Sequence, residues 1–227
     1  MVIKIASDMK KEIFEVADIH HKELPASIMT HMGLDFLANI YYPACIDSPN
    51  FHCFAYTYEG RVIGFTSISN GSDTGGLILL LFKYPLKLLV YMATLPFKNF
   101  KGFCLTVRTV YHMLFAPKEP LHDVPCEQVS TAILLEFRSL EFFKRTNIRV
   151  SRELYMHMLK FLLDNNIEKI KGFSVESDIF VNANVRNLGY EKQFVGLIPN
   201  RNPIHRLVGY TWDVKSAAKK FGLIPST

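Results

Sequence analysis

Four cations precede a helical pattern in the stretch "FFKRTNIRVSRELYMHMLKFLL", residues 142–163: Lys144, Arg145, Arg149 and Arg152. The apolar residues that follow recur at helical spacing and predict a helix over about 150–165. Free N–H groups and the dipole at a helix N-terminus attract anions. The stretch therefore predicts either a phosphate-binding loop at 144–151 or a solvated helix start with exposed cations.

A carboxylate in an apolar run is the second candidate for chemistry. The run "VSTAILLEFRSL", residues 129–140, predicts a buried strand that contains Glu136. A carboxylate is costly to bury in a strand unless it is paired or used. Glu136 is therefore either a general base or the partner of Arg138, two residues further along the same strand face.

The length and composition limit the class of protein. With 227 residues and 49% hydrophobic residues, the chain suits one domain over 1–227 with an insertion at 74–118. A net charge of +5 points to an anionic partner and gives no prediction of nucleic-acid binding. The four cysteines form no C-x-x-C pair and the histidines no H-x-x-x-H pair, so no metal is expected. The expected compartment is a reducing cytoplasm.

One apolar stretch has the length of a membrane span. Residues 77–97, "LILLLFKYPLKLLVYMATLPF", contain Lys83, Lys87, Pro85 and Pro96. Two charges and an internal proline argue against a helix in lipid. Two short amphipathic helices broken at the prolines are expected instead, and no transmembrane segment.

The remaining patterns predict a mixed α/β order with one insertion. The expected elements are a strand at 2–7, helices at 9–24 and 26–46 (loosened at Gly33 and ending near Pro43), a hairpin at 51–71 turning at Glu59-Gly60, the insertion, the strand 129–140, a helix at about 150–165, a strand at 167–177, a helix at 178–190, and strands at 191–199 and 205–214. The aromatic stretch 208–212 could pair with a second subunit in a homodimer.

Four strings in this order resemble the GNAT superfamily of CoA-dependent N-acyltransferases. They are "ADIHHKELPASIMTHMGLDFLANIYY" (17–42), "YEGRVIGFTSIS" (58–69), "AILLEFRS" (132–139) followed by the basic loop, and "VESDIFVNANVRNLGYEK" (175–192). The resemblance implies a mostly antiparallel central sheet of about six or seven strands flanked by helices, with the insertion before the central strand. It also implies transfer of an acetyl or other acyl group from CoA to an amine of a small molecule or peptide, by direct attack.

The resemblance also assigns roles to residues. Backbone amides of Phe137, Arg138, Ser139 and Leu140 would hold the thioester carbonyl. The loop of Lys144, Arg145, Thr146, Asn147, Ile148, Arg149, Val150 and Ser151 would hold the pyrophosphate. Asn182 would bind the pantetheine amides or cap a helix locally. Glu23 would contact the acceptor amine and is the alternative to Glu136 as general base, or it would lie solvated at a helix end. One of His20 and His21 faces the core.

Two places depart from the family pattern. The loop has no glycine, and Asn147 with Arg149, or Arg149 with Ser151, stand at the glycine positions. Asn tolerates positive φ better than most residues, so a cradle with cationic help remains feasible. The usual acid tyrosine is replaced by Val185, and Tyr155 is a candidate to protonate the leaving sulfur.

The insertion 74–118 has six cations and no acid. It predicts an acceptor lid, a dock for an acidic acyl carrier protein, a contact with anionic lipid, or amphipathic helices packed on the sheet. A carrier-protein donor and a binding or regulatory module on the same scaffold remain alternatives to a CoA-dependent enzyme.

Overall fold

The computed structural model describes residues 1–25, 27–71, 83–100, 102–104, 106–107, 121, 123–175, 191–198 and 205–225. Its strands form one seven-stranded sheet in the order β1-β2-β3-β4-β5-β7-β6. They are β1 (Val2–Lys4), β2 (Phe51–Tyr58), β3 (Arg61–Asn70), β4 (Cys126–Ile133), β5 (Lys169–Val175), β6 (Glu191–Ile198) and β7 (His205–Asp213). Only the β4–β5 pair is parallel among these strands, which confirms the expected mixed, mostly antiparallel sheet.

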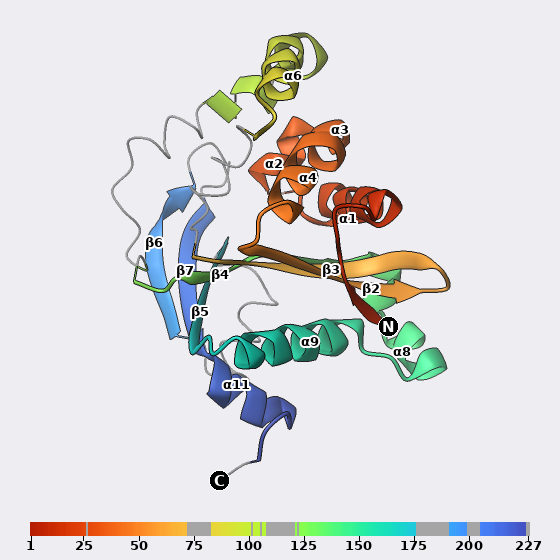
Figure 1. The fold of residues 1–227 in the computed structure, drawn as a ribbon, viewed down its shortest axis with the longest axis vertical. Coiled ribbons are helices and arrows are strands. Elements are labelled where there is room, and N and C mark those ends of the chain that lie inside the picture. Colours follow the sequence, from red (N-terminus) through yellow and green to blue (C-terminus); the bar gives the residue numbers. More distant parts are fainter. Residues whose placement is uncertain are drawn as a thin grey trace.

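Helices cover both faces of the sheet (Figure 1). They are α1 (Lys10–Glu23), α2 (Ile28–Met32), α3 (Leu34–Phe36), the π-helical turn η1 (Leu37–Tyr41), α4 (Tyr42–Ile46), α6 (Pro85–Lys98), the 3₁₀ turn η3 (Leu135–Arg138), α8 (Leu140–Thr146), α9 (Val150–Asp164) and α11 (Val214–Phe221). The first four helices lie on one face and α9 with α11 on the other. In the part of the chain that is described, no helix is long and apolar enough to cross a membrane.

The second helical region is interrupted twice, and each interruption has a local cause. Gly33, at φ 96°, separates α2 from α3, as the sequence predicted. Pro43 lacks the N–H that would bond to the carbonyl four residues earlier. The chain widens there into η1, where the Tyr42 N–H donates to the Leu37 carbonyl. The helix therefore continues past Pro43 as α4 and does not end there, contrary to expectation.

The C-terminal strand β7 is an interior strand of the sheet. β7 pairs with β5 on one side and β6 on the other, so residues 208–212 lie inside the sheet. The expected pairing of this strand with a second subunit is therefore wrong.

The sequence also missed α11, which follows β7 and packs against α9 through the stacked rings of Phe221 and Tyr155.

A buried histidine joins three helices on the α1–α4 face. His20 is 1% exposed; its Nδ1 lies 2.7 Å from the Tyr42 hydroxyl and its Nε2 lies 2.9 Å from Ser27 Oγ. Burial, with a smaller contribution from His21, lowers the pKa of His20 to about 4. His20 is thus the core-facing member of the pair, whereas His21 is partly exposed.

This histidine predicts a loss of stability in acid. Between its ordinary pKa of 6.5 and the folded value of about 4, His20 binds a proton only when the protein unfolds. Above pH 6.5, neutral His20 makes its full contribution to the free energy of unfolding. As pH falls towards 4, the free energy of unfolding decreases by up to about 3 kcal/mol. Urea unfolding across this range should show a shallower pH slope for His20→Gln than for the unaltered protein.

His21→Gln is the matched control, and it should keep the slope. Some slope remains in every variant, because burial and nearby Lys4 also lower the pKa of His52 to about 4. An unchanged slope in His20→Gln would contradict the prediction.

Candidate active site at the β4–β5 fork

The pairing of β4 changes on both sides at Val129. Towards β3, the register moves from Ser67 opposite Ser130 to Ile68 opposite Gln128, so Val129 is an extra residue in a β-bulge. Towards β5, the paired residues are Glu127 with Lys171 and Gln128 with Gly172. Beyond Gln128, no described residue of β5 continues the ladder along β4. We call the place where this pairing ends the fork.

The fork divides the sheet into two differently oriented parts. In Figure 1, β2 and β3 run across the view, whereas β5, β6 and β7 run nearly upright. Backbone N–H and C=O groups need partners, and an extended ligand that carries amides can take the place of a missing strand. The edge of β4 over residues 129–133 is therefore suited to an extended amide-containing chain.

Polar side chains gather at the fork on the α9 face. The Tyr155 hydroxyl donates to Gln128 Oε1 at 3.2 Å, and Gln128 Nε2 donates to Thr131 Oγ1 at 2.7 Å. Thr66 Oγ1 lies 2.7 Å from Thr131 Oγ1. Tyr155 is 4% exposed. The structure thus brings the candidate acid Tyr155 to the last residue of β4 that pairs with β5.

A buried carboxylate and a buried ammonium lie on the β4–β5 residue pair just before the fork. Glu127 and Lys171 are register partners, 4% and 3% exposed, and Lys171 Nζ donates to the Leu121 carbonyl at 3.3 Å. Burial, then Cys45, and to a lesser degree Glu127 raise the pKa of Tyr41 in η1. Because Glu127 acts on Tyr41, which belongs to η1 on the α1–α4 side of the sheet, Glu127 faces that side. Tyr155 of α9 lies on the opposite side.

Sequence reasoning missed Glu127 because it began the strand at Val129. The strand begins at Cys126, and the eight residues "CEQVSTAI" carry the signal that was overlooked. Cys126 is buried and two polar residues follow it, Glu127 and Gln128, both of them buried as well. Buried polar groups inside a central strand indicate pairing or use.

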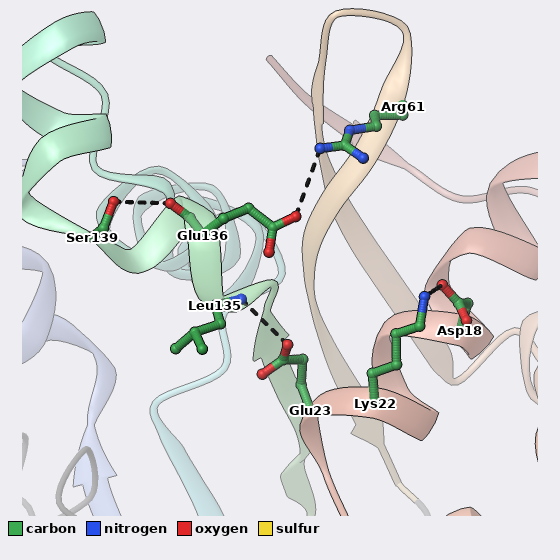
Figure 2. Close-up of polar contacts among 7 residues, drawn as sticks. All are labelled: Asp18, Lys22, Glu23, Arg61, Leu135, Glu136 and Ser139. Carbon is green, nitrogen blue, oxygen red and sulfur yellow. Dashed lines mark hydrogen bonds and ion pairs between the residues drawn. The ribbon is translucent and has the colours of Figure 1, made fainter.

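Glu136 does not lie on the central strand, contrary to expectation. β4 ends at Ile133, and Glu136 belongs to the 3₁₀ turn η3. Its side chain is 59% exposed and points to Arg61 of β3, with Oε1 and Nη2 3.7 Å apart (Figure 2). The expected partner Arg138 binds a different carboxylate. An exposed ion pair of this kind contributes little.

That other carboxylate is Glu23, at the end of α1. It accepts hydrogen bonds from the Leu135 N–H at 3.2 Å and from the Arg138 guanidinium. Figure 2 shows the first of these contacts, which crosses from α1 to the turn after β4. Glu23 thus lies beside the end of the central strand and holds η3 against α1.

The segment expected to hold the thioester carbonyl forms a turn and a helix start, in which the Phe137 amide is used locally. The Phe137 N–H donates to the Leu134 carbonyl at 3.0 Å. Ser139 is the N-cap of α8, and its hydroxyl accepts from the Phe142 N–H at 3.1 Å. Leu140 begins α8. This segment is a turn and a helix cap, not the strand end that the sequence predicted.

The four cations of the basic loop belong to two different helix ends. Lys144 and Arg145 occupy the last turn of α8, where positive charge is favourable. Arg149 is the N-cap of α9 and Arg152 lies in its first turn, where positive charge is unfavourable and Glu153 is the one acidic residue. The Arg149 guanidinium lies 4.5 Å from the Phe143 ring centroid.

Asn147 occupies the left-handed conformation that the sequence allowed for it. Its φ is 56° and its ψ 21°, and it ends α8. Its N–H donates to the Phe143 carbonyl at 2.7 Å, and the Ile148 N–H donates to Thr146 Oγ1 at 3.2 Å. Two of the loop amides are therefore used internally. The N-cap Arg149 has no side-chain acceptor, so its side chain cannot accept hydrogen bonds from the first-turn amides of α9, Val150–Arg152.

Two expectations fall outside this description. Asn182 and the helix expected at 178–190 lie outside the described residues. Within the described ranges, no group of three or more histidine, cysteine, aspartate or glutamate side chains is arranged to hold a metal ion.

Comparison with solved structures identifies the fold. A ribosomal-protein-alanine N-acetyltransferase from Brucella melitensis aligns over 94% of this chain and 99% of its own, with a TM-score of 0.54 and 10% sequence identity. An N-acetyltransferase from Staphylococcus aureus aligns over 94% and 98%, with a TM-score of 0.54 and 10% identity. The chain thus has the fold of the GNAT N-acetyltransferases, as the resemblance implied. No family model and no curated protein sequence matches it.

The conformation of Asn147 gives a direct test of the loop geometry. Asn147→Ala should lower the free energy of unfolding by about 1 kcal/mol, because alanine is strained at positive φ. Asn147→Gly should change it by less than about 0.5 kcal/mol, since glycine adopts this conformation freely. Urea unfolding of both variants measures the difference, and equal effects of alanine and glycine would contradict the left-handed cap.

Proposed function

We propose that this chain transfers an acyl group, most simply acetyl, from CoA to an amine of a small molecule or peptide. The observation that carries the proposal is the fork at Val129, on a sheet whose fold is shared with N-acetyltransferases. The fork exposes one edge of the central strand beside the N-terminus of α9. A donor with an extended amide-containing arm and a diphosphate matches both features.

The donor side of the proposed site uses backbone and cations together. The pantetheine amides would bond to the edge of β4 beyond Gln128, in place of a β5 residue. The diphosphate would lie at the first turn of α9, with Arg149 and Arg152 beside it. Since Asn147 and Ile148 use their amides internally, side-chain charge has a larger share here than in a glycine-rich loop.

The proposed chemistry uses groups on the two faces of the sheet. Glu127, on the α1–α4 side, would take a proton from the acceptor amine. The amine nitrogen then bonds to the acyl carbon, and the carbon–sulfur bond breaks. Tyr155, on the α9 side, would return a proton to the departing sulfur. Glu23 would act as a positioning residue, because it fixes η3 beside the end of β4.

Calorimetric titration with CoA tests the donor site. Arg149→Ala and Arg152→Ala should each weaken CoA binding about tenfold, because each removes a charge at the diphosphate. The loss should shrink as salt is raised. Lys144→Ala is the matched control, since Lys144 is accounted for by the C-terminus of α8 and should leave binding nearly unchanged.

Absence of CoA binding by the unaltered protein would overturn the CoA-dependent function. In that case, binding of an acylated carrier protein would support the carrier-protein alternative. Failure of both donors would leave a binding or regulatory module on the same scaffold.

Acetylation of a panel of polyamines, arylamines and peptide N-termini tests the proposed base. Glu127→Gln should lower kcat by about 10²-fold or more, while CoA affinity stays unchanged. Glu136→Gln is the matched control, because that exposed carboxylate is bound to Arg61. A large effect of Glu136→Gln with none from Glu127→Gln would assign the base to Glu136.

A further inference from the structure

The outward face of α6 is apolar. Leu86, Leu89, Val90 and Phe97 are 78%, 67%, 60% and 91% exposed, and Phe100, just after the helix, is 68% exposed. At 100° per residue, these side chains fall on one side of the helix. The opposite side holds Leu95, which is 1% exposed, and partly buried Leu88, Tyr91 and Met92, which pack against the core. We call the exposed set the α6 stripe.

The 15-residue helix α9 has no such apolar stripe on its exposed side. The exposed side of α9 consists of Arg152, Glu153, His157, Lys160 and Asp164, all polar. A helix that packs on a sheet and faces water has this pattern. A contiguous exposed apolar stripe indicates an interaction surface instead.

The charges around the stripe select the kind of partner. Lys87 and Lys98 lie along its edge, and Lys83 precedes the helix; all three are exposed. The whole insertion 74–118 has six cations and no acid. On α1, Lys10 and half-exposed Phe14 line a groove of about 410 Å³ together with Lys87 and Asp47. Asp35 lies with Leu86, Lys87 and Val90 around a second hollow. The described lysines around the stripe still outnumber these two aspartates, which favours a partner that is both anionic and apolar.

We propose that α6 docks this protein on the surface of an anionic lipid bilayer. The α6 stripe would enter the boundary between headgroups and acyl chains, with the lysines at the headgroup phosphates. With 14 residues, α6 lies in the membrane plane and does not span it. Figure 1 places α6 at the end of the molecule farthest from α11 and the C-terminus.

The balance of side chains favours lipid over an acidic protein. An acidic carrier protein would satisfy the lysines, but it would need an apolar groove for five large side chains projecting from a convex helix. A bilayer accepts such a stripe without a matching shape. The inference does not depend on acyl transfer, because α6 contributes no residue to the fork.

Flotation of the purified full-length chain with lipid vesicles tests this docking. The protein should float with vesicles of phosphatidylcholine and phosphatidylglycerol, and much less with vesicles of phosphatidylcholine alone. Leu89→Ser and Phe97→Ser should each lower the partition coefficient about tenfold or more, because each removes a large side chain from the lipid. Leu140→Ser, at 64% exposure on α8, is the matched control for Leu89 and should leave partitioning unchanged.

Substitutions of the lysines test the electrostatic contribution to vesicle binding. Lys87→Glu and Lys98→Glu should each weaken binding to the anionic vesicles about fivefold or more, and added salt should reduce the difference. Lys215→Glu, exposed on α11 at the opposite end, is the control for net charge and should have little effect.

Three results would overturn the proposal. Equal flotation with both kinds of vesicle would remove the anionic requirement. No flotation, together with a dimer in sedimentation that Leu89→Ser dissociates, would assign the stripe to a second copy of this chain. No flotation, together with binding of an acidic carrier protein that Lys87→Glu abolishes, would assign it to a carrier protein.

Discussion

The β-bulge at Val129 is the constraint on which the rest of this structure depends. One extra residue in β4 coincides with the end of its pairing with β5, so the parallel contact extends over only two register pairs. The two parts of the sheet then follow different directions (Figure 1). The same feature leaves an edge of the central strand without a β5 partner and sets Glu127 and Tyr155 on opposite faces beside it. The geometry of the candidate site is thus a consequence of interrupted strand pairing.

The electrostatics of the segment after β4 follow from its division into a short helix, α8, and a long one, α9. The left-handed Asn147 ends α8 and lets α9 begin in a new direction. Two cations are thereby placed at a helix C-terminus, where the dipole favours them, and two at a helix N-terminus, where only an anion would make them favourable. Glu23 fixes the start of this segment from α1. The loop can therefore be ordered before any ligand arrives, with two arginines and one glutamate, Glu153, at the start of α9.

The α6 stripe and the fork use different physical principles on different parts of the molecule. The fork is built from buried polar groups and backbone, which favour one extended ligand in one orientation. The stripe is built from exposed apolar side chains and lysines, which favour a broad anionic surface and demand little shape complementarity. An enzyme with acyl transfer at the fork and lipid docking by the α6 stripe would act on acceptors near a membrane. Each of the two proposals can be disproved without the other.

The sequence by itself determined the order of the seven described strands, the hairpin turning at Glu59-Gly60, the helix over about 150–165, and the left-handed tolerance of Asn147. These features follow from side-chain periodicity and from backbone preferences that act within a few residues. Only the tertiary structure decided that β4 ends at Ile133, because the run "LLEFRS" is as apolar as a strand and its turn is held by Glu23, 112 residues away along the chain from Leu135. It also decided that Glu127 is buried at the fork, that Glu136 is exposed, and that β7 lies inside the sheet. Those outcomes depend on which strands pair with each other. Local sequence patterns do not specify contacts with residues that are distant along the chain.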